Sequence, residues 1–213
     1  MAVEAGQVTG ARSIRTVDRT ASVAVLDIIS LAFARDPIAR FWWPAAHDYL
    51  YWWPRFAAAL NGRGFDHGSV DLIDGCAAAM WLPPGIETDP ADMAAVDADP
   101  GPTHADPALE QSFDFDAETV SERLRTEMAR FHPDEPHWYL GVIGTDPNRQ
   151  GQGHAARLME HRLAIIDQAG DLAYLEASNP GLVPFYQRFG FEQIGVIDAN
   201  PVPPLFAMVR RRG

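Results

Sequence analysis

Apolar residues recur along the chain either at alternate positions, as in a strand, or every three to four residues, as in a helix. The clearest series of such segments spans residues 138–191. It begins with a bulky, β-prone run that ends near Thr145, because Pro147 cannot continue a strand. Apolar residues then recur at helical spacing over 155–169, and Gly170 suits the C-terminal cap of that helix. The pattern predicts a strand, a Gly-rich turn and a helix in direct succession.

The same two periods predict the other elements of the fold. Ahead of this stretch we expect a strand at 13–17, a helix at 20–34 stopped by Asp36-Pro37, a hairpin at 70–82 and a helix at 116–131. After it we expect two closing strands at 191–197 and 205–209. This order predicts an α+β layout with a mixed, largely antiparallel sheet.

One domain is expected for a chain of 213 residues, since the ratio of surface to volume favours a single core at this size. Residues 1–12 show no pattern and are expected to form a flexible tail, which leaves 13–213 as the domain. Within it, residues 85–118 are acidic and Pro-rich and contain no Lys or Arg. They predict a surface insertion, either a solvated loop or a lid.

Composition narrows the class of protein. The net charge is −12 and every basic residue is arginine, which argues against nucleic acid as the main partner, because phosphate contacts need a basic face. No apolar run is long enough to span a membrane, and no secretion signal is indicated. The single cysteine, Cys76, lies in an apolar run and is expected to be a buried thiol in a reducing cytoplasm. The histidines show no metal-ligand spacing, so no metal is expected.

Strand, Gly-rich turn and helix N-terminus together predict an anion site, because unpaired N–H groups and the helix dipole converge there. A Walker loop needs a lysine, which this chain lacks. A dinucleotide loop fits Gly151 to Ala156, with Glu176 about 20 residues on. However, Asp146 to Gln150 separate that loop from the strand, and too few strands follow it for a doubly wound sheet.

The third phosphate-loop pattern is Q/R-x-x-G-x-G/A, matched by Gln150, Gly153 and Ala155. With the strand at 173–179 and the block Pro184-Phe185-Tyr186 ahead of Phe189-Gly190-Phe191, the chain resembles the GNAT family of N-acetyltransferases. In layout it is most similar to the puromycin N-acetyltransferase-like branch. The resemblance implies a three-layer fold whose sheet splays at the central strand, and acetyl-CoA as the acyl donor.

The resemblance also assigns the residues that would hold acetyl-CoA. A backbone N–H, most simply that of Ile143, would point at the acetyl carbonyl, and Asn179 would contact the CoA arm. Tyr186 matches the family tyrosine that protonates the leaving thiolate, and a phenol with a pKa near 10 can donate at neutral pH. The residues expected at the cofactor are Val142, Ile143, Gly144, Thr145, Gln150, Gly151, Gln152, Gly153, His154, Ala155, Asn179 and Tyr186.

Glu176 is the candidate general base, directly or through a water. It lies in a strand between apolar neighbours, where partial burial would raise the pKa of its carboxyl toward neutrality. A salt-bridged strand glutamate is the alternative, and His137 and Tyr139 are further candidates near the site. Tyr186 and Glu176 are therefore the predicted catalytic residues.

An aromatic cluster precedes the hairpin, with four of the six tryptophans within twelve residues. Such a cluster can be core or pocket lining, and in the family the first two helices shape the acceptor site. Asp36 would hold an ammonium group at the rim of that site, or would simply end a helix. The residues expected at the acceptor are Phe33, Asp36, Trp42 and Tyr139.

Taken together, the sequence predicts a cytoplasmic N-acetyltransferase that passes an acetyl group directly from acetyl-CoA to a primary amine of a small molecule. The lack of an activated Cys or Ser is consistent with direct attack. A protein or peptide acetyltransferase and a non-catalytic CoA-binding module are the alternatives. We expect a monomer or a homodimer with no nucleic-acid or membrane partner.

Overall fold

A computed structural model of the chain describes residues 13–102 and 115–211. The predicted tail at 1–12 and part of the predicted acidic insertion, 103–114, lie outside the described residues. None of the helices within the described ranges is long and apolar enough to cross a membrane.

A seven-stranded sheet with the strand order β1-β2-β3-β4-β5-β7-β6 forms the middle layer. All neighbouring strands are antiparallel except β4 and β5, which are parallel. The predicted mixed, mostly antiparallel sheet is therefore confirmed. The strands are β1 (Arg15–Val17), β2 (Val70–Ile73), β3 (Ala77–Leu82), β4 (His137–Thr145), β5 (Leu172–Ala177), β6 (Glu192–Ile197) and β7 (Leu205–Arg210).

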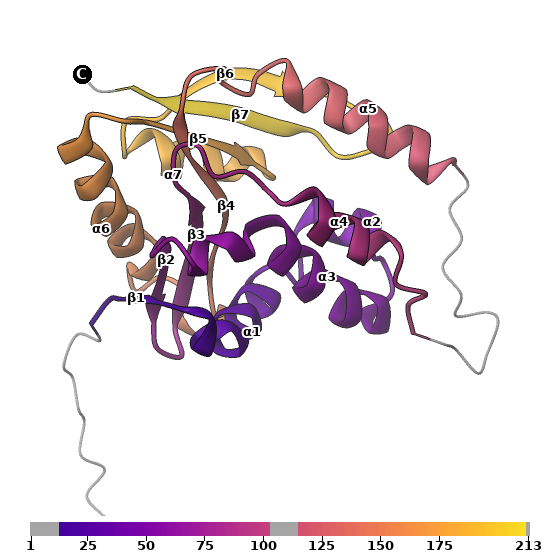
Figure 1. Cartoon of the computed structure of the whole chain (residues 1–213), viewed down its shortest axis with the longest axis horizontal. Coiled ribbons are helices and arrows are strands. Elements are labelled where there is room, and N and C mark those ends of the chain that lie inside the picture. Colours follow the sequence, from indigo (N-terminus) through magenta and orange to yellow (C-terminus); the bar gives the residue numbers. More distant parts are fainter. Residues whose placement is uncertain (1–12, 103–114, 212–213) are drawn as a thin grey trace, which may run out of the picture.

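Helices cover both faces of the sheet (Figure 1). One face packs on α6 and α7, and the other packs on α1 and α3 at its N-terminal half and on α5 at its C-terminal half. The core is accordingly divided into three apolar clusters around one sheet. The helices are α1 (Ser22–Ala32), α2 (Pro37–Trp42), α3 (Ala46–Asn61), α4 (Pro90–Asp97), α5 (Ala117–Ala129), α6 (His154–Ala169) and α7 (Val183–Gln187).

Local sequence explains where several helices begin. Asp36 precedes Pro37 and caps α2, because its Oδ1 accepts hydrogen bonds from the N–H groups of Ile38 and Ala39, both at 3.0 Å. Asp116 caps α5 in the same way, as the sequence predicts. The dipeptide Asp36-Pro37 thus starts α2 as well as following α1, although the sequence pattern marks it only as the end of a helix.

The helix α6 is attached to the sheet by a buried ion pair. Arg162 interrupts the apolar face of α6, and its guanidinium donates to both carboxylate oxygens of Asp71 on β2, at 2.9 and 2.7 Å. Both side chains are almost fully buried, and Thr16 donates a further hydrogen bond to Asp71 at 2.8 Å. The pair therefore fixes the helix that follows the Gly-rich turn onto the N-terminal half of the sheet.

Candidate active site

The central feature of the site is a gap between β4 and β5. Their ladder runs from His137–Leu172 to Leu140–Leu175 and no further, although β4 continues to Thr145 along β3. At the point of separation the register with β3 shifts, because Met80 pairs with Val142 whereas Trp81 pairs with Leu140. Gly141 is therefore a bulged residue, and the two strands diverge from it as the GNAT resemblance implies.

Val142 to Thr145, which are expected to contact the acetyl carbonyl and the pantetheine arm of acetyl-CoA, lie on β4 along this gap. The side chain of Val142 packs into the cluster under α1 and α3, whereas Ile143 packs against the cluster under α6. Alternate main-chain N–H and C=O groups of a strand point to its two edges. Some of these groups on β4 therefore face β5, with no ladder between the two strands.

The Gly-rich turn lies at the end of β4 and leads into α6. Gly151 and Gly153 have φ angles of 74° and 76°, in the left-handed region that favours glycine, and a Cβ at either residue would meet no atom within 4 Å. Residues 150–153 are exposed. The first N–H groups of α6 have no partner within the helix, and the dipole of the helix adds positive charge there. The loop thus fits a pyrophosphate, because open space lies in front of a helix N-terminus.

Glu176 lies on β5 beside the gap, and its carboxyl is partly buried. Burial raises its pKa to about 7, and the hydroxyls of Tyr139 and Tyr174 oppose this rise only in part. Within the described residues, Oε1 of Glu176 and the hydroxyl of Tyr174 make no hydrogen bond of normal length. These tyrosines therefore act on the carboxyl through a looser contact, and Glu176 has the proton affinity of a base that works near neutral pH.

The two tyrosines form one wall beside Glu176. Tyr139 and Tyr174 are paired in register across β4 and β5, and their rings stack with centroids 6.2 Å apart. His132 contacts both rings, at 5.9 and 5.1 Å. Tyr139 is predicted from the sequence at the acceptor, and the structure places it against Glu176. Tyr174 was not predicted, although its place two residues before Glu176 on one strand puts both on the same face.

Tyr186 lies on α7, and its side chain is 6% exposed. It packs into the cluster that α6 covers, on the sheet face opposite to Tyr174. Burial raises the pKa of its phenol, and the nearby Asp36 carboxylate raises it further. Tyr186 therefore stays protonated at neutral pH, which suits a proton donor. The two predicted catalytic side chains belong to opposite faces of the sheet.

Asp36 connects the N-terminal helices to the end of β5. Its Oδ2 accepts a hydrogen bond from the hydroxyl of Ser178, while its Oδ1 caps α2. Burial raises the pKa of this carboxyl, and the hydrogen bonds from Ser178, Ala39 and Ile38 oppose the rise. Ser178 follows Glu176 by two residues, so Asp36 lies beside the same part of the gap. Ser178 was not predicted, because its partner is 142 residues away in the sequence.

The remaining predicted residues make contacts with parts of the structure other than the gap. Phe33 stacks on Trp53 at 4.8 Å and is half-buried in the core under α1. Trp42 contacts the edge of Phe115 at 6.4 Å. Asn179 is exposed, and its side-chain oxygen accepts a hydrogen bond from the N–H of Gly181 at 2.8 Å. These contacts are compatible with the predicted roles but do not require them.

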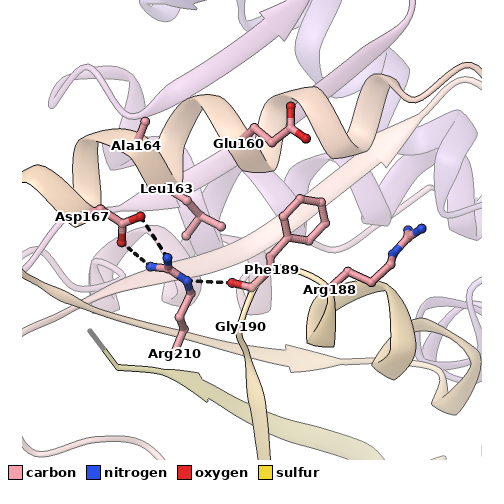
Figure 2. Close-up of a pocket in the computed structure, with 8 residues that line it drawn as sticks. All are labelled: Glu160, Leu163, Ala164, Asp167, Arg188, Phe189, Gly190 and Arg210. Carbon is pink, nitrogen blue, oxygen red and sulfur yellow. Dashed lines mark hydrogen bonds and ion pairs between the residues drawn. The ribbon is translucent and has the colours of Figure 1, made fainter. Parts of the chain in front are cut away.

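A separate surface hollow of about 500 Å³ lies between α6, the turn after α7 and β7 (Figure 2). Arg210 crosses it and donates hydrogen bonds to Asp167 at 2.9 Å and to the carbonyl of Phe189 at 2.7 Å. None of the predicted site residues lines this hollow. The hollow thus marks where α6 is tied to β7, away from the gap.

Comparison with known proteins agrees with this geometry. Residues 119–191 match the family model described as the acetyltransferase (GNAT) family. About a third of the chain is thus similar to the GNAT family. The fold of the chain is that of a solved structure described as histone acetyltransferase HPA2 and related acetyltransferase from Corynebacterium glutamicum, with a TM-score of 0.61 and 23% identity over 94% of this chain and 96% of the other. The predicted fold class is confirmed.

Sequence relatives match a shorter part of the chain than the solved structure does. An uncharacterized N-acetyltransferase of Schizosaccharomyces pombe is 36% identical over 80 residues, which is 36% of this chain and 32% of that protein. The mycothiol acetyltransferase of Mycobacterium avium is 35% identical over 104 residues, 43% of this chain and 32% of that protein. The matches thus span about a third of the length of these curated relatives, and both relatives are acyltransferases by name.

Proposed function

We propose that the protein is an acetyl-CoA-dependent N-acetyltransferase that acts by direct transfer on a primary amine of a small molecule. The observation that carries this proposal is the carboxyl of Glu176, with a pKa of about 7, beside a gap in the sheet, with Tyr186 on the opposite face of that sheet. A base on one face and an acid on the other suit attack from one side of the gap and departure of the leaving group on the other.

The fit of acetyl-CoA rests on two parts of the structure. The turn with Gly151 and Gly153 would hold the pyrophosphate at the N-terminus of α6. The free edge of β4, from Val142 to Thr145, would hold the pantetheine arm, and the N–H of Ile143 would polarise the acetyl carbonyl. One well-aimed donor of this kind lowers the barrier by roughly 2.7–4 kcal/mol.

In the proposed reaction, Glu176 and Tyr186 each carry out one proton transfer. Acetyl-CoA supplies a thioester whose carbonyl carbon the amine nitrogen attacks. An acceptor that arrives as an ammonium ion first loses one proton to solvent, because only the neutral amine can attack. A new C–N bond then forms, the C–S bond breaks, and the nitrogen loses a second proton. Glu176 accepts that proton, and Tyr186 gives its phenolic proton to the sulfur that leaves. Proton return from Glu176 to Tyr186 through solvent restores both groups for the next cycle.

A small acceptor is supported by three features. Asp36 and Glu176 place two carboxyls near one end of the gap, which favours an amine that arrives as an ammonium ion. The aromatic rings of Phe33, Trp53 and Tyr139 lie on the same face of the sheet as these carboxyls. The relative from Mycobacterium avium is named for mycothiol, a small molecule. The placement in the puromycin N-acetyltransferase-like branch stays a prediction of the sequence.

The proposal is tested by the release of thiol from acetyl-CoA in the presence of puromycin, aminoglycosides, polyamines or a lysine peptide. We expect release that depends on one class of small amine, and a loss of about 10²-fold or more in kcat for Tyr186→Phe. Release only with the lysine peptide would favour a peptide acceptor. A shift of the melting temperature by acetyl-CoA without release for any amine would favour a binding module instead.

A further inference from the structure

A buried carboxamide lies against the bulge of β4. Asn61, the last residue of α3, is 0% exposed. Within the described residues, neither its Oδ1 nor its Nδ2 has a hydrogen-bond partner. A buried polar group left unsatisfied costs about 1–3 kcal/mol. If this position only had to be filled, an apolar residue would therefore give a more stable protein than Asn61.

Asn61 occupies the place where a side chain of Gly141 would lie. A Cβ at Gly141 would come within 2.0 Å of Oδ1 and 2.3 Å of Nδ2 of Asn61, much closer than real atoms approach. Gly141 is not among the glycines with positive φ. Space for Asn61, rather than an unusual backbone angle, thus requires glycine at this residue.

The contact lies where β4 leaves β5. Gly141 is the bulged residue, it directly follows the last ladder pair Leu140–Leu175, and it precedes Ile143 by two residues. A bulge leaves its extra residue unpaired and changes the direction in which the following residues point. The conformation of Gly141 consequently decides where the N–H of Ile143 is aimed.

We propose that Asn61 is a positioning residue for acyl transfer: packed on Gly141, its carboxamide holds the bulge in the conformation that aims the Ile143 N–H at the acyl carbonyl. This inference rests on the proposed function. It goes beyond that function because it assigns a role to a side chain on α3 that would touch neither acetyl-CoA nor the amine. An apolar residue of similar size should fill the position without setting the peptide orientation.

The first experiment uses Asn61→Leu. Because Leu removes an unsatisfied buried amide, we expect the melting temperature to stay unchanged or to rise. We expect kcat for thiol release to fall by about 10- to 100-fold, since a misaligned donor stabilises the developing charge less. The Kd of CoA, which lacks the acetyl carbonyl, should stay within twofold of wild type (about 0.4 kcal/mol). A purely structural role would instead change the melting temperature and leave kcat intact.

The second experiment tests the contact with Gly141 directly. Gly141→Ala should lower both the melting temperature and kcat, because the new methyl group clashes with Asn61. Asn61→Ala combined with Gly141→Ala should recover the melting temperature lost in Gly141→Ala but keep kcat low. Wild-type kcat in this double variant would overturn the proposal, because the bulge would then work without the carboxamide.

Ser69→Ala is the matched control. Ser69 is equally buried and donates its hydroxyl hydrogen bond to the carbonyl of Trp81 at 2.6 Å, next to the same part of the sheet. Its loss should lower the melting temperature and leave kcat unchanged. If wild-type protein releases no thiol, the proposed function fails; if wild type is active and Asn61→Leu keeps full kcat, only the role of Asn61 fails.

Discussion

The hydroxyl of Ser178 donates a hydrogen bond to Asp36, and this contact joins the residue after β5 to the first turn of α2. One oxygen of Asp36 caps the helix and the other takes Ser178, so the carboxylate belongs both to the N-terminal helices and to the strand that carries Glu176. The same carboxylate raises the pKa of Tyr186. In the proposed mechanism, Asp36 would therefore act on both the acceptor amine and Tyr186.

Replacing Asp36 separates its charge from its capping role. Asn caps helices about as well as Asp, so Asp36→Asn should leave the melting temperature within about 2 °C. It should raise KM for a cationic amine about 10-fold, which corresponds to about 1.4 kcal/mol. Ser178→Ala, which keeps the charge, should raise KM less. Equal KM values in all three proteins would mean that Asp36 only caps α2.

Glu176 makes activity depend on pH. A base must be ionised to accept a proton, so kcat/KM should rise through pH about 7 and then level. Glu176→Gln should remove this rising limb and lower kcat at pH 8 about 10²-fold or more. The pH profiles of wild type and Glu176→Gln, measured with the same amine, check this directly. A rising limb that persists unchanged in the variant would assign the titration to another group.

The same group makes stability depend on pH. The folded-state pKa of Glu176 lies above its ordinary value of 4.5, so its stabilising contribution is complete below pH 4.5 and is lost as pH rises through about 7. Above pH 7, Glu176→Gln should therefore melt higher than wild type, by roughly 6–12 °C for about 3 kcal/mol. At pH 5 the difference should largely vanish. Thermal melts at pH 5 and pH 8 measure both values.

A substitution at Gly153 tests whether the Gly-rich turn binds the pyrophosphate of CoA. Because no atom crowds a Cβ there, Gly153→Ala should act only through its positive φ, at a cost of about 1–3 kcal/mol. The affinity for CoA should fall, whereas turnover of S-acetyl-N-acetylcysteamine, which has no pyrophosphate, should change little. Gly68→Ala is the control, since Gly68 has a φ of 61°, an open Cβ position and no place in the loop. Equal loss of CoA affinity in both variants would contradict the loop assignment.

The buried pair of Asp71 and Arg162 should dominate stability among the ion pairs described here. Arg162→Met leaves the Asp71 carboxylate buried without its main partner and should cost about 3–5 kcal/mol. Arg15→Met breaks the exposed pair with Asp74 and should change the free energy of unfolding little, because solvent screens that pair. Urea unfolding of the two variants compares them. Similar losses would show that burial adds nothing to the pair.

Much of the fold could be predicted because local sequence signals mark where its helices and strands begin and end. The strand that ends at Thr145 and the helix that ends before Gly170 follow from β-propensity, Pro147 and apolar spacing, and the hairpin follows from its turn. The short helix α2 could not be predicted from a stop signal, since Asp36-Pro37 also suits a helix start. The insertion of β7 between β5 and β6 depends on packing rather than on chain order.

The site was predictable only where a motif fixes it. Glu176 lies on β5 beside the gap and the glycine turn follows β4, whereas Tyr186 packs on the opposite face of the sheet, in the cluster that α6 covers. Tyr174, Ser178 and Asn61 carry no motif, because their importance comes from partners far away in the sequence. Arg162 likewise looks like an interruption of an apolar face until Asp71, 91 residues away, lies opposite to it.

Because the ladder between β4 and β5 ends early, part of a central strand has an unpaired edge, as an outer strand of a sheet does. From Gly141 to Thr145, β4 is paired with β3 on one side only, although it is a central strand. Exposed strand edges can accept another strand, and proteins usually protect them. A bound donor would cover this edge, so its amides should exchange with deuterium quickly in the free protein and slowly in the complex. Because a bound acyl donor would cover this edge, its concentration would then also affect how readily two copies of the protein pair through it.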